Sequence, residues 1–175
     1  QEKHGTARLF LADPTVPDTA WHIRESWLAG GSPFRVIAAR LVEGSMRLDE
    51  VDTPALILEL DAFETNLKRL AQAVAGRVRV RAHAKTHKCP EIGKRQVAAG
   101  AVGVCCQKVS EAEAMVEGGV GDVLVSNEVV GAQKLERLAT LAGRARIGVC
   151  VDDAGNVRDL EAAMKRSGAR VDVYI

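Results

Sequence analysis

The segment RVRAHAKTHKCP, residues 79–90, decides how the rest of the chain is interpreted. From Val78 to Lys85, apolar and polar residues alternate, which is the pattern of a strand with one apolar and one polar face. Pro90 suits the first turn of a helix, because its ring fixes φ. The pattern therefore predicts that Lys85 ends a strand feeding a helix, where α/β proteins place their chemistry.

Lys85 is a candidate nucleophile for Schiff-base chemistry. Arg81, His83, His87 and Lys88 lie close to it in the sequence, and neighbouring positive charges favour the neutral, reactive form of a lysine amine. The alternative interpretation is a basic strand end on a solvated surface. Spacing alone leaves both interpretations open.

From residue 46 onward the chain repeats a βα pattern. Predicted strands cover 55–60, 78–85, 103–107, 122–127, 147–151 and 171–175, and glycines follow the helices between them. The polar residues ending successive strands recur every 20 to 25 residues: Lys85, Gln107, Asn127 and Asp152. This spacing predicts a parallel α/β sheet, either open or closed into a barrel. Since a full barrel takes about 250 residues, a barrel here would be truncated after about five strands.

Predicted helix caps lie at three places: Asp61 with Glu64, Ser110 with Glu113, and Asp152-Asp153. Residues 1–45 show no sustained period and are interpreted as an unmatched extension, with Met46 as the natural start. A real N-terminal arm that packs on a partner is the alternative. The resulting division is 1–45, then 46–77 as a strand and helix leading into the barrel, then 78–175 as its first half.

Composition excludes several function classes. A net charge of +1 and 3% aromatic residues argue against a nucleic-acid binder. No apolar run reaches the ~20 residues of a membrane span, and the four cysteines form no C-x-x-C pair. We therefore expect a cytoplasmic protein with reduced, buried thiols.

No metal site is predicted within this chain. A zinc site built from His83, His87 and Cys89 is disfavoured, because the histidines straddle a strand end and no fourth ligand is evident. Cys105 and Cys106 are interpreted as core and strand-end residues rather than a redox pair, since adjacent cysteines rarely bridge without strain.

Four motifs, taken together, resemble a known family. They are DTPAL (52–56), HAKTHKCP (83–90), CCQKVSEA (105–112) and SNEVV (126–130). In this order and spacing they resemble D-threonine aldolase and 3-hydroxy-D-aspartate aldolase and, more distantly, D-serine dehydratase. These are pyridoxal-phosphate enzymes of the alanine racemase fold. The resemblance covers 46–175.

The resemblance implies a fold, a cofactor and a site. The fold is a pyridoxal-phosphate-binding (β/α)8 barrel of the alanine racemase type, here partial, with the remaining barrel and a C-terminal β domain absent. Lys85 would bind pyridoxal 5'-phosphate covalently, His83 would pack on the pyridine ring, and Gln107 and Asn127 would face the cofactor. A divalent metal is also implied, with its ligands outside this chain.

The implied function is retro-aldol cleavage of D-threonine or 3-hydroxy-D-aspartate type substrates to glycine and an aldehyde, by a homodimer when full length. The fragment alone is expected to be inactive or nearly so. One alternative is D-serine dehydratase activity, which releases ammonia. Another is a non-catalytic pyridoxal-phosphate carrier, and a third is a polyanion-binding module using Arg77, Arg79 and Arg81.

Overall fold

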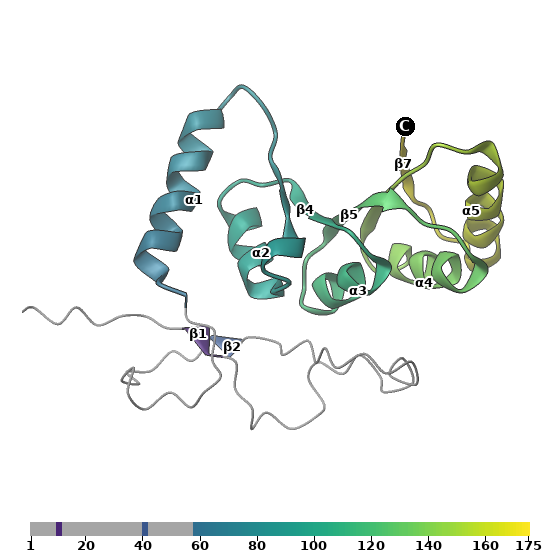
Figure 1. Cartoon of the computed structure of the whole chain (residues 1–175), viewed down its shortest axis with the longest axis horizontal. Helices are drawn as coiled ribbons and strands as arrows, with labels where there is room; N and C mark the ends of the chain where they lie inside the picture. Colours follow the sequence, from purple (N-terminus) through teal and green to yellow (C-terminus); the bar gives the residue numbers. More distant parts are fainter. Residues whose placement is uncertain (1–9, 12–39, 42–57) are drawn as a thin grey trace, which may run out of the picture. The chain divides into compact units, whose positions relative to one another are not determined.

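The computed structural model describes residues 10–11, 40–41 and 58–175 (Figure 1). The chain divides into two compact units, Gln1–Gly76 and Arg77–Ile175. In the first unit, β1 (Phe10–Leu11) pairs with β2 (Arg40–Leu41) in antiparallel orientation. The interpretation of 1–45 as an extension, and of Met46 as the start, otherwise lies outside the described residues.

Helix α1 (Leu60–Val74) corrects two sequence predictions. Its N-cap is Glu59, whose carboxylate accepts hydrogen bonds from the backbone N–H groups of Asp61 and Ala62 at 3.0 and 2.7 Å. Asp61 therefore lies inside the helix rather than capping it. The strand predicted over 55–60 is wrong at its end, because Leu60 already begins the helix, while 55–57 lie outside the described residues.

The second unit is a five-stranded parallel sheet in sequential order. Its strands are β3 (Arg81–His83), β4 (Gly103–Cys106), β5 (Asp122–Glu128), β6 (Arg146–Cys150) and β7 (Asp172–Tyr174). Between them run η3 (Ala84–Thr86), α2 (Pro90–Ala98), α3 (Val109–Glu117), α4 (Ala132–Ala142) and α5 (Ala154–Ser167). This confirms the predicted βα repeat, although β3 is shorter than the alternation over 78–85 suggested.

The strand order identifies the sheet as barrel-like. Consecutive right-handed crossovers without a reversal of direction place every helix on the same face, whereas an open doubly wound sheet reverses its order. In Figure 1, α2, α3 and α4 lie along one side of the strands. The sheet stays unclosed between β3 and β7, as expected for a partial barrel.

The core lies between the sheet and its helices. Alternate strand residues face the helices and are almost fully buried: Val104, Cys106, Val123, Val125, Ile147 and Val149. They pack in one cluster with the apolar stripes of the helices, among them Met115, Leu138 and Leu160. Each such side chain contributes about 1.5–3 kcal/mol on burial, so this layer holds the strand ends in place.

The opposite face of the sheet, which would be the lumen of a closed barrel, begins with a row of charges. Arg81 Nη1 lies 2.6 Å from Asp122 Oδ1, and Arg146 Nε lies 2.7 Å from Asp172 Oδ2. Arg146 also approaches Asp122, at 3.7 Å. These pairs link β3, β5, β6 and β7 at the amino end of the strands, the end of a barrel associated with stability rather than catalysis.

Two further caps differ in outcome. Asp153 Oδ1 accepts a hydrogen bond from the Asn156 backbone N–H at 2.8 Å, which confirms the cap of α5. The predicted Ser110–Glu113 cap is wrong, because α3 already begins at Val109 and Glu113 instead forms a bidentate ion pair with Arg137 of α4. In the described part of the chain, no helix has the length and apolar character to cross a membrane.

Candidate functional site

Lys85 lies on the 3₁₀ turn η3, two residues past the end of β3 and before α2. His83 is the N-cap of this turn, and its Nδ1 accepts a hydrogen bond from the Lys85 backbone N–H at 3.3 Å. Ala84 between them is buried, with 1% of its surface exposed, which fixes the turn to the core. The Lys85 side chain is exposed at the carboxyl edge of the sheet.

The charges near Lys85 are not arranged as the sequence suggested. Arg81 pairs with Asp122 at the other end of β3, and the Lys88 ammonium lies 3.4 Å from Glu111 Oε1. Both cations are therefore compensated by carboxylates. Among the described strands the sheet is also unclosed, and the Lys85 side chain is exposed rather than buried among positive charges.

His83 is joined to a residue that sequence reasoning missed. Its Nε2 lies 3.3 Å from Ser126 Oγ of β5, and that hydroxyl donates to the Cys106 carbonyl oxygen of β4 at 3.3 Å. The contact skips a strand, since β4 lies between β3 and β5. Sequence spacing carries no signal for it, because it depends on how the three strands align.

Gln107 and Asn127 follow on the next two strands. The Gln107 backbone N–H donates to Glu111 Oε2 at 2.8 Å, and Asn127 Nδ2 donates to the Gln107 carbonyl oxygen at 3.5 Å. Both residues are half-buried. The structure thus links these two predicted residues to each other, and both lie at the carboxyl edge of the sheet, where Lys85 also lies.

An irregularity in β5 explains where Asn127 lies. Val125 pairs with Val149 and Glu128 with Cys150, so two residues of β5 are extra relative to β6. Strict alternation would turn Asn127 toward the helices, beside Val125. Bulges of this kind redirect side chains and are frequent beside active sites.

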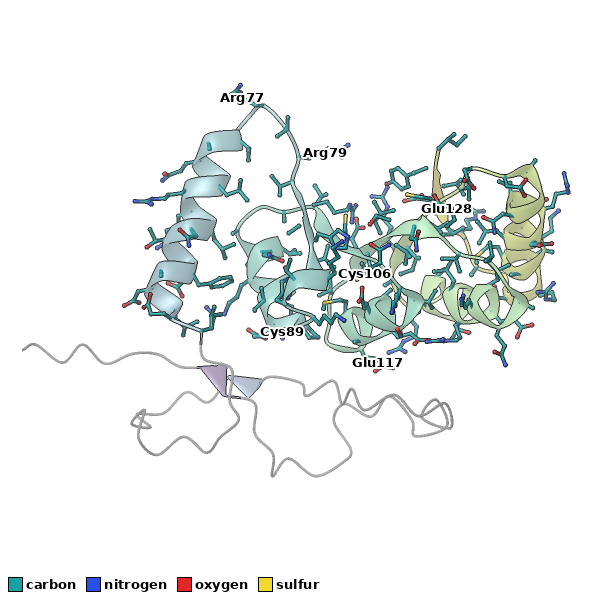
Figure 2. All side chains as sticks on the ribbon, in the orientation of Figure 1. Arg77, Arg79, Cys89, Cys106, Glu117 and Glu128 are labelled. Carbon is teal, nitrogen blue, oxygen red and sulfur yellow. The ribbon has the colours of Figure 1, made fainter. Side chains whose placement is uncertain are left out.

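The prediction of buried thiols holds for two of the four cysteines. All four are free, but only Cys89 and Cys106 are buried, whereas Cys105 and Cys150 are half-buried. Cys106 faces the core, in the middle of the side chains shown in Figure 2. Burial, followed by the nearby Glu111 carboxylate and Cys105, raises the pKa of Cys106 to about 12. Cys105 lies on the opposite face of the same strand, so the two do not form a redox pair.

His87 is a second histidine near the turn, with a different role. Its Nδ1 accepts a hydrogen bond from the Cys89 backbone N–H at 3.1 Å, just before Pro90 begins α2. Burial lowers the pKa of His87, against smaller opposing effects from Gln96 and the Cys89 backbone. The neutral imidazole therefore holds the start of α2.

Acid should therefore destabilise this unit through His87. Below pH ~6.5 the unfolded chain binds a proton that folded His87 resists, so stability falls as the pH drops from there toward the lowered folded-state pKa. We expect the melting temperature to fall less between pH 7 and pH 5 in His87→Asn, whose Oδ1 can replace Nδ1 as acceptor. Equal slopes for variant and wild type in thermal melts would contradict this assignment.

Metal ligation has no support from side-chain clusters here. Within 58–175 and the two short described strands, no group of three or more His, Cys, Asp or Glu side chains is arranged to hold an ion. The chemistry available at this edge is that of an amine, an imidazole and two amides.

Comparisons with known proteins agree on one family. The model of the alanine racemase N-terminal domain matches residues 58–175. The chain is 53% identical to a D-threonine aldolase from Arthrobacter sp over 130 residues, covering 73% of this chain and 34% of that protein. It is 47% identical over 129 residues to a 3-hydroxy-D-aspartate aldolase from Paracoccus denitrificans (strain Pd 1222), covering 72% and 33%.

A solved structure is similar over the same region. The crystal structure of D-threonine aldolase from Filomicrobium marinum matches with a TM-score of 0.69 and 64% sequence identity, covering 72% of this chain and 34% of that one. The chain thus spans about a third of the length of the curated relatives it matches.

Proposed function

Because the chain belongs to the alanine racemase N-terminal domain family, we propose that it anchors the cofactor in a pyridoxal-phosphate-dependent lyase acting on D-β-hydroxy amino acids. The observation that carries this proposal is the exposed Lys85 amine at the carboxyl edge of the sheet, on a turn capped by His83. Identities of 53% and 64% to two D-threonine aldolases support retro-aldol cleavage as the reaction.

The residues at this edge fit the cofactor by their chemistry. An accessible primary amine condenses with an aldehyde, and an imidazole offers a flat face to an aromatic ring. Amide side chains such as those of Gln107 and Asn127 both donate and accept hydrogen bonds. We propose that Lys85 binds pyridoxal phosphate covalently, with His83 at its ring and the two amides at its polar substituents.

The chain's own residues would position the reaction. When bound, the cofactor supplies an electron sink for the bond that breaks at the substrate Cα. Lys85 would hold the cofactor through its amine, and the capped turn would fix the backbone position of that amine. The β-hydroxyl must also lose a proton; the divalent metal expected for this step, the homodimer and the cytoplasmic location remain predictions.

A chimera tests the activity directly. In this protein, called the chimera from here on, residues 58–175 replace the corresponding segment of the Arthrobacter D-threonine aldolase. With D-threonine we expect glycine and acetaldehyde in equal amounts. Ammonia and a 2-oxo acid would instead favour the dehydratase alternative, and cofactor binding without turnover would favour the carrier. The 175-residue chain alone is expected to bind cofactor weakly and turn over little, because among the described strands neither edge of its sheet has a second partner.

The polyanion-binding alternative loses its basis in the structure. Arg81 is neutralised by Asp122, at 2.6 Å. Arg77 and Arg79 precede β3 and stand apart from the sheet core marked by Cys106 in Figure 2. These three arginines therefore do not form one basic stripe along a strand.

A further inference from the structure

We propose that Ser126 is a positioning residue for Lys85 and acts through the His83 imidazole. The effect of this positioning on cofactor chemistry rests on the proposed function above. The positioning itself concerns only the described residues, because each contact in it joins two groups of β3, η3, β4 or β5.

The hydrogen bonds around His83 have only one consistent direction. A backbone N–H can only donate, so His83 Nδ1 must accept from Lys85 and carries no proton. In the neutral ring the proton is then on Nε2, which donates to Ser126 Oγ. The hydroxyl has a single proton, and it is donated to the Cys106 carbonyl oxygen. The chain of donors therefore runs from Lys85 N–H through His83 and Ser126 to Cys106.

This series of hydrogen bonds connects η3, which carries Lys85, to β5, a strand that does not pair with β3. β3 is an edge strand of only three residues, paired with β4 alone among the described strands. The Ser126 hydroxyl fixes the imidazole from the far side of β4, and the imidazole caps the first N–H of η3. Ser126 follows the helix-facing Val125 in β5, so strand alternation places it on the same face of the sheet as His83.

The opposite tautomer would break the cap. A proton on Nδ1 would face the Lys85 N–H, donor against donor, and η3 would lose the contact at its first residue. Ser126 disfavours that tautomer because its Oγ accepts from Nε2 while its own proton is engaged by Cys106. The backbone of Lys85 is then held in one conformation, so its side chain starts from one fixed position.

The test is a spectroscopic reading of His83 in the 175-residue chain, using ¹⁵N shifts of the imidazole, with the signals assigned by comparison with His83→Asn. Wild type should show the Nε2–H tautomer. In Ser126→Ala the ratio of the two tautomers should move about fivefold toward Nδ1–H, the change expected for one neutral hydrogen bond. Ser126→Thr, which keeps a hydroxyl, should restore the wild-type ratio. Ser110→Ala, on α3, should leave the ratio unchanged.

A second measurement follows the reactivity of the Lys85 amine. The initial rate of borohydride-fixed pyridoxal phosphate incorporation at Lys85 should fall about fivefold in Ser126→Ala and recover in Ser126→Thr. If Ser126→Ala does not fold, the volume-matched Ser126→Cys, a weaker hydrogen-bonding group, should shift the tautomer in the same direction.

An unchanged tautomer ratio in the folded variant, or an equal change in Ser110→Ala, would overturn the proposal. A shifted tautomer with no label on Lys85 in the chimera would refute the proposed function, while Ser126 would still position the turn.

Discussion

Replacing Lys85 with alanine is expected to abolish covalent capture of pyridoxal phosphate by this chain and to lower turnover by the chimera about 10⁴-fold or more. The reason is chemical rather than structural. The Lys85 side chain is exposed, and the turn η3 is stabilised through backbone groups and the buried Ala84, which the substitution leaves in place. The measurements are the mass of the peptide containing residue 85 after borohydride treatment, and glycine formation from D-threonine.

The matched control is Lys88→Ala. Lys88 is also exposed and lies three residues away, but its ammonium is paired with Glu111 at 3.4 Å. This variant should retain the label on residue 85 and most of the turnover. A label found on Lys88 rather than on Lys85 in the wild type, or normal turnover in Lys85→Ala, would contradict the role assigned to Lys85.

The fold could be predicted because its signals are local. Each βα unit has an apolar strand, a helix with one apolar stripe and a glycine after the helix, so the strands from β4 onward appear close to where the sequence placed them. Gly168, in the left-handed conformation at φ 68°, ends α5 as predicted. The choice between an open sheet and a barrel required the strand order, which local patterns do not contain.

The site was only partly predictable, because its decisive contacts are long-range. Lys85, Gln107 and Asn127 follow from their place at strand ends, but Ser126 does not, since its contact with His83 depends on how β3, β4 and β5 align. The predicted cap of Ser110 with Glu113 failed for a related reason, because Glu113 has a partner 24 residues away, Arg137 of α4.

Gly103 is the position where an added methyl group should do the most damage to stability. It begins β4, between Arg81 of β3 and Asp122 of β5. A Cβ there would lie 2.3 Å from the Asp122 carbonyl oxygen and 2.5 Å from Arg81 Nη1. The absent side chain is what lets Arg81 reach across β4 to Asp122, so that the charged row spans the strand.

Gly103→Ala should therefore destabilise the unit by about 3 kcal/mol, a cost at the upper end for overpacking, and lower its melting temperature by roughly 15 °C. The clash with Arg81 could be relieved by movement of that side chain, but the Asp122 carbonyl belongs to the sheet backbone. Most of the loss should therefore persist when Gly103→Ala is made in an Arg81→Ala background.

Gly121→Ala is the control for this substitution, because the position that its methyl group would take has no heavy atom within 4 Å beyond its chain neighbours. Its melting temperature should stay close to that of wild type. Thermal and urea unfolding of both glycine variants, of Arg81→Ala and of the double variant would separate the two contributions. If Arg81→Ala restored the stability of Gly103→Ala fully, the clash with the Asp122 carbonyl oxygen would not be the cause. The backbones of β4 and β5 would then have to move apart at their amino ends to make room for the methyl group.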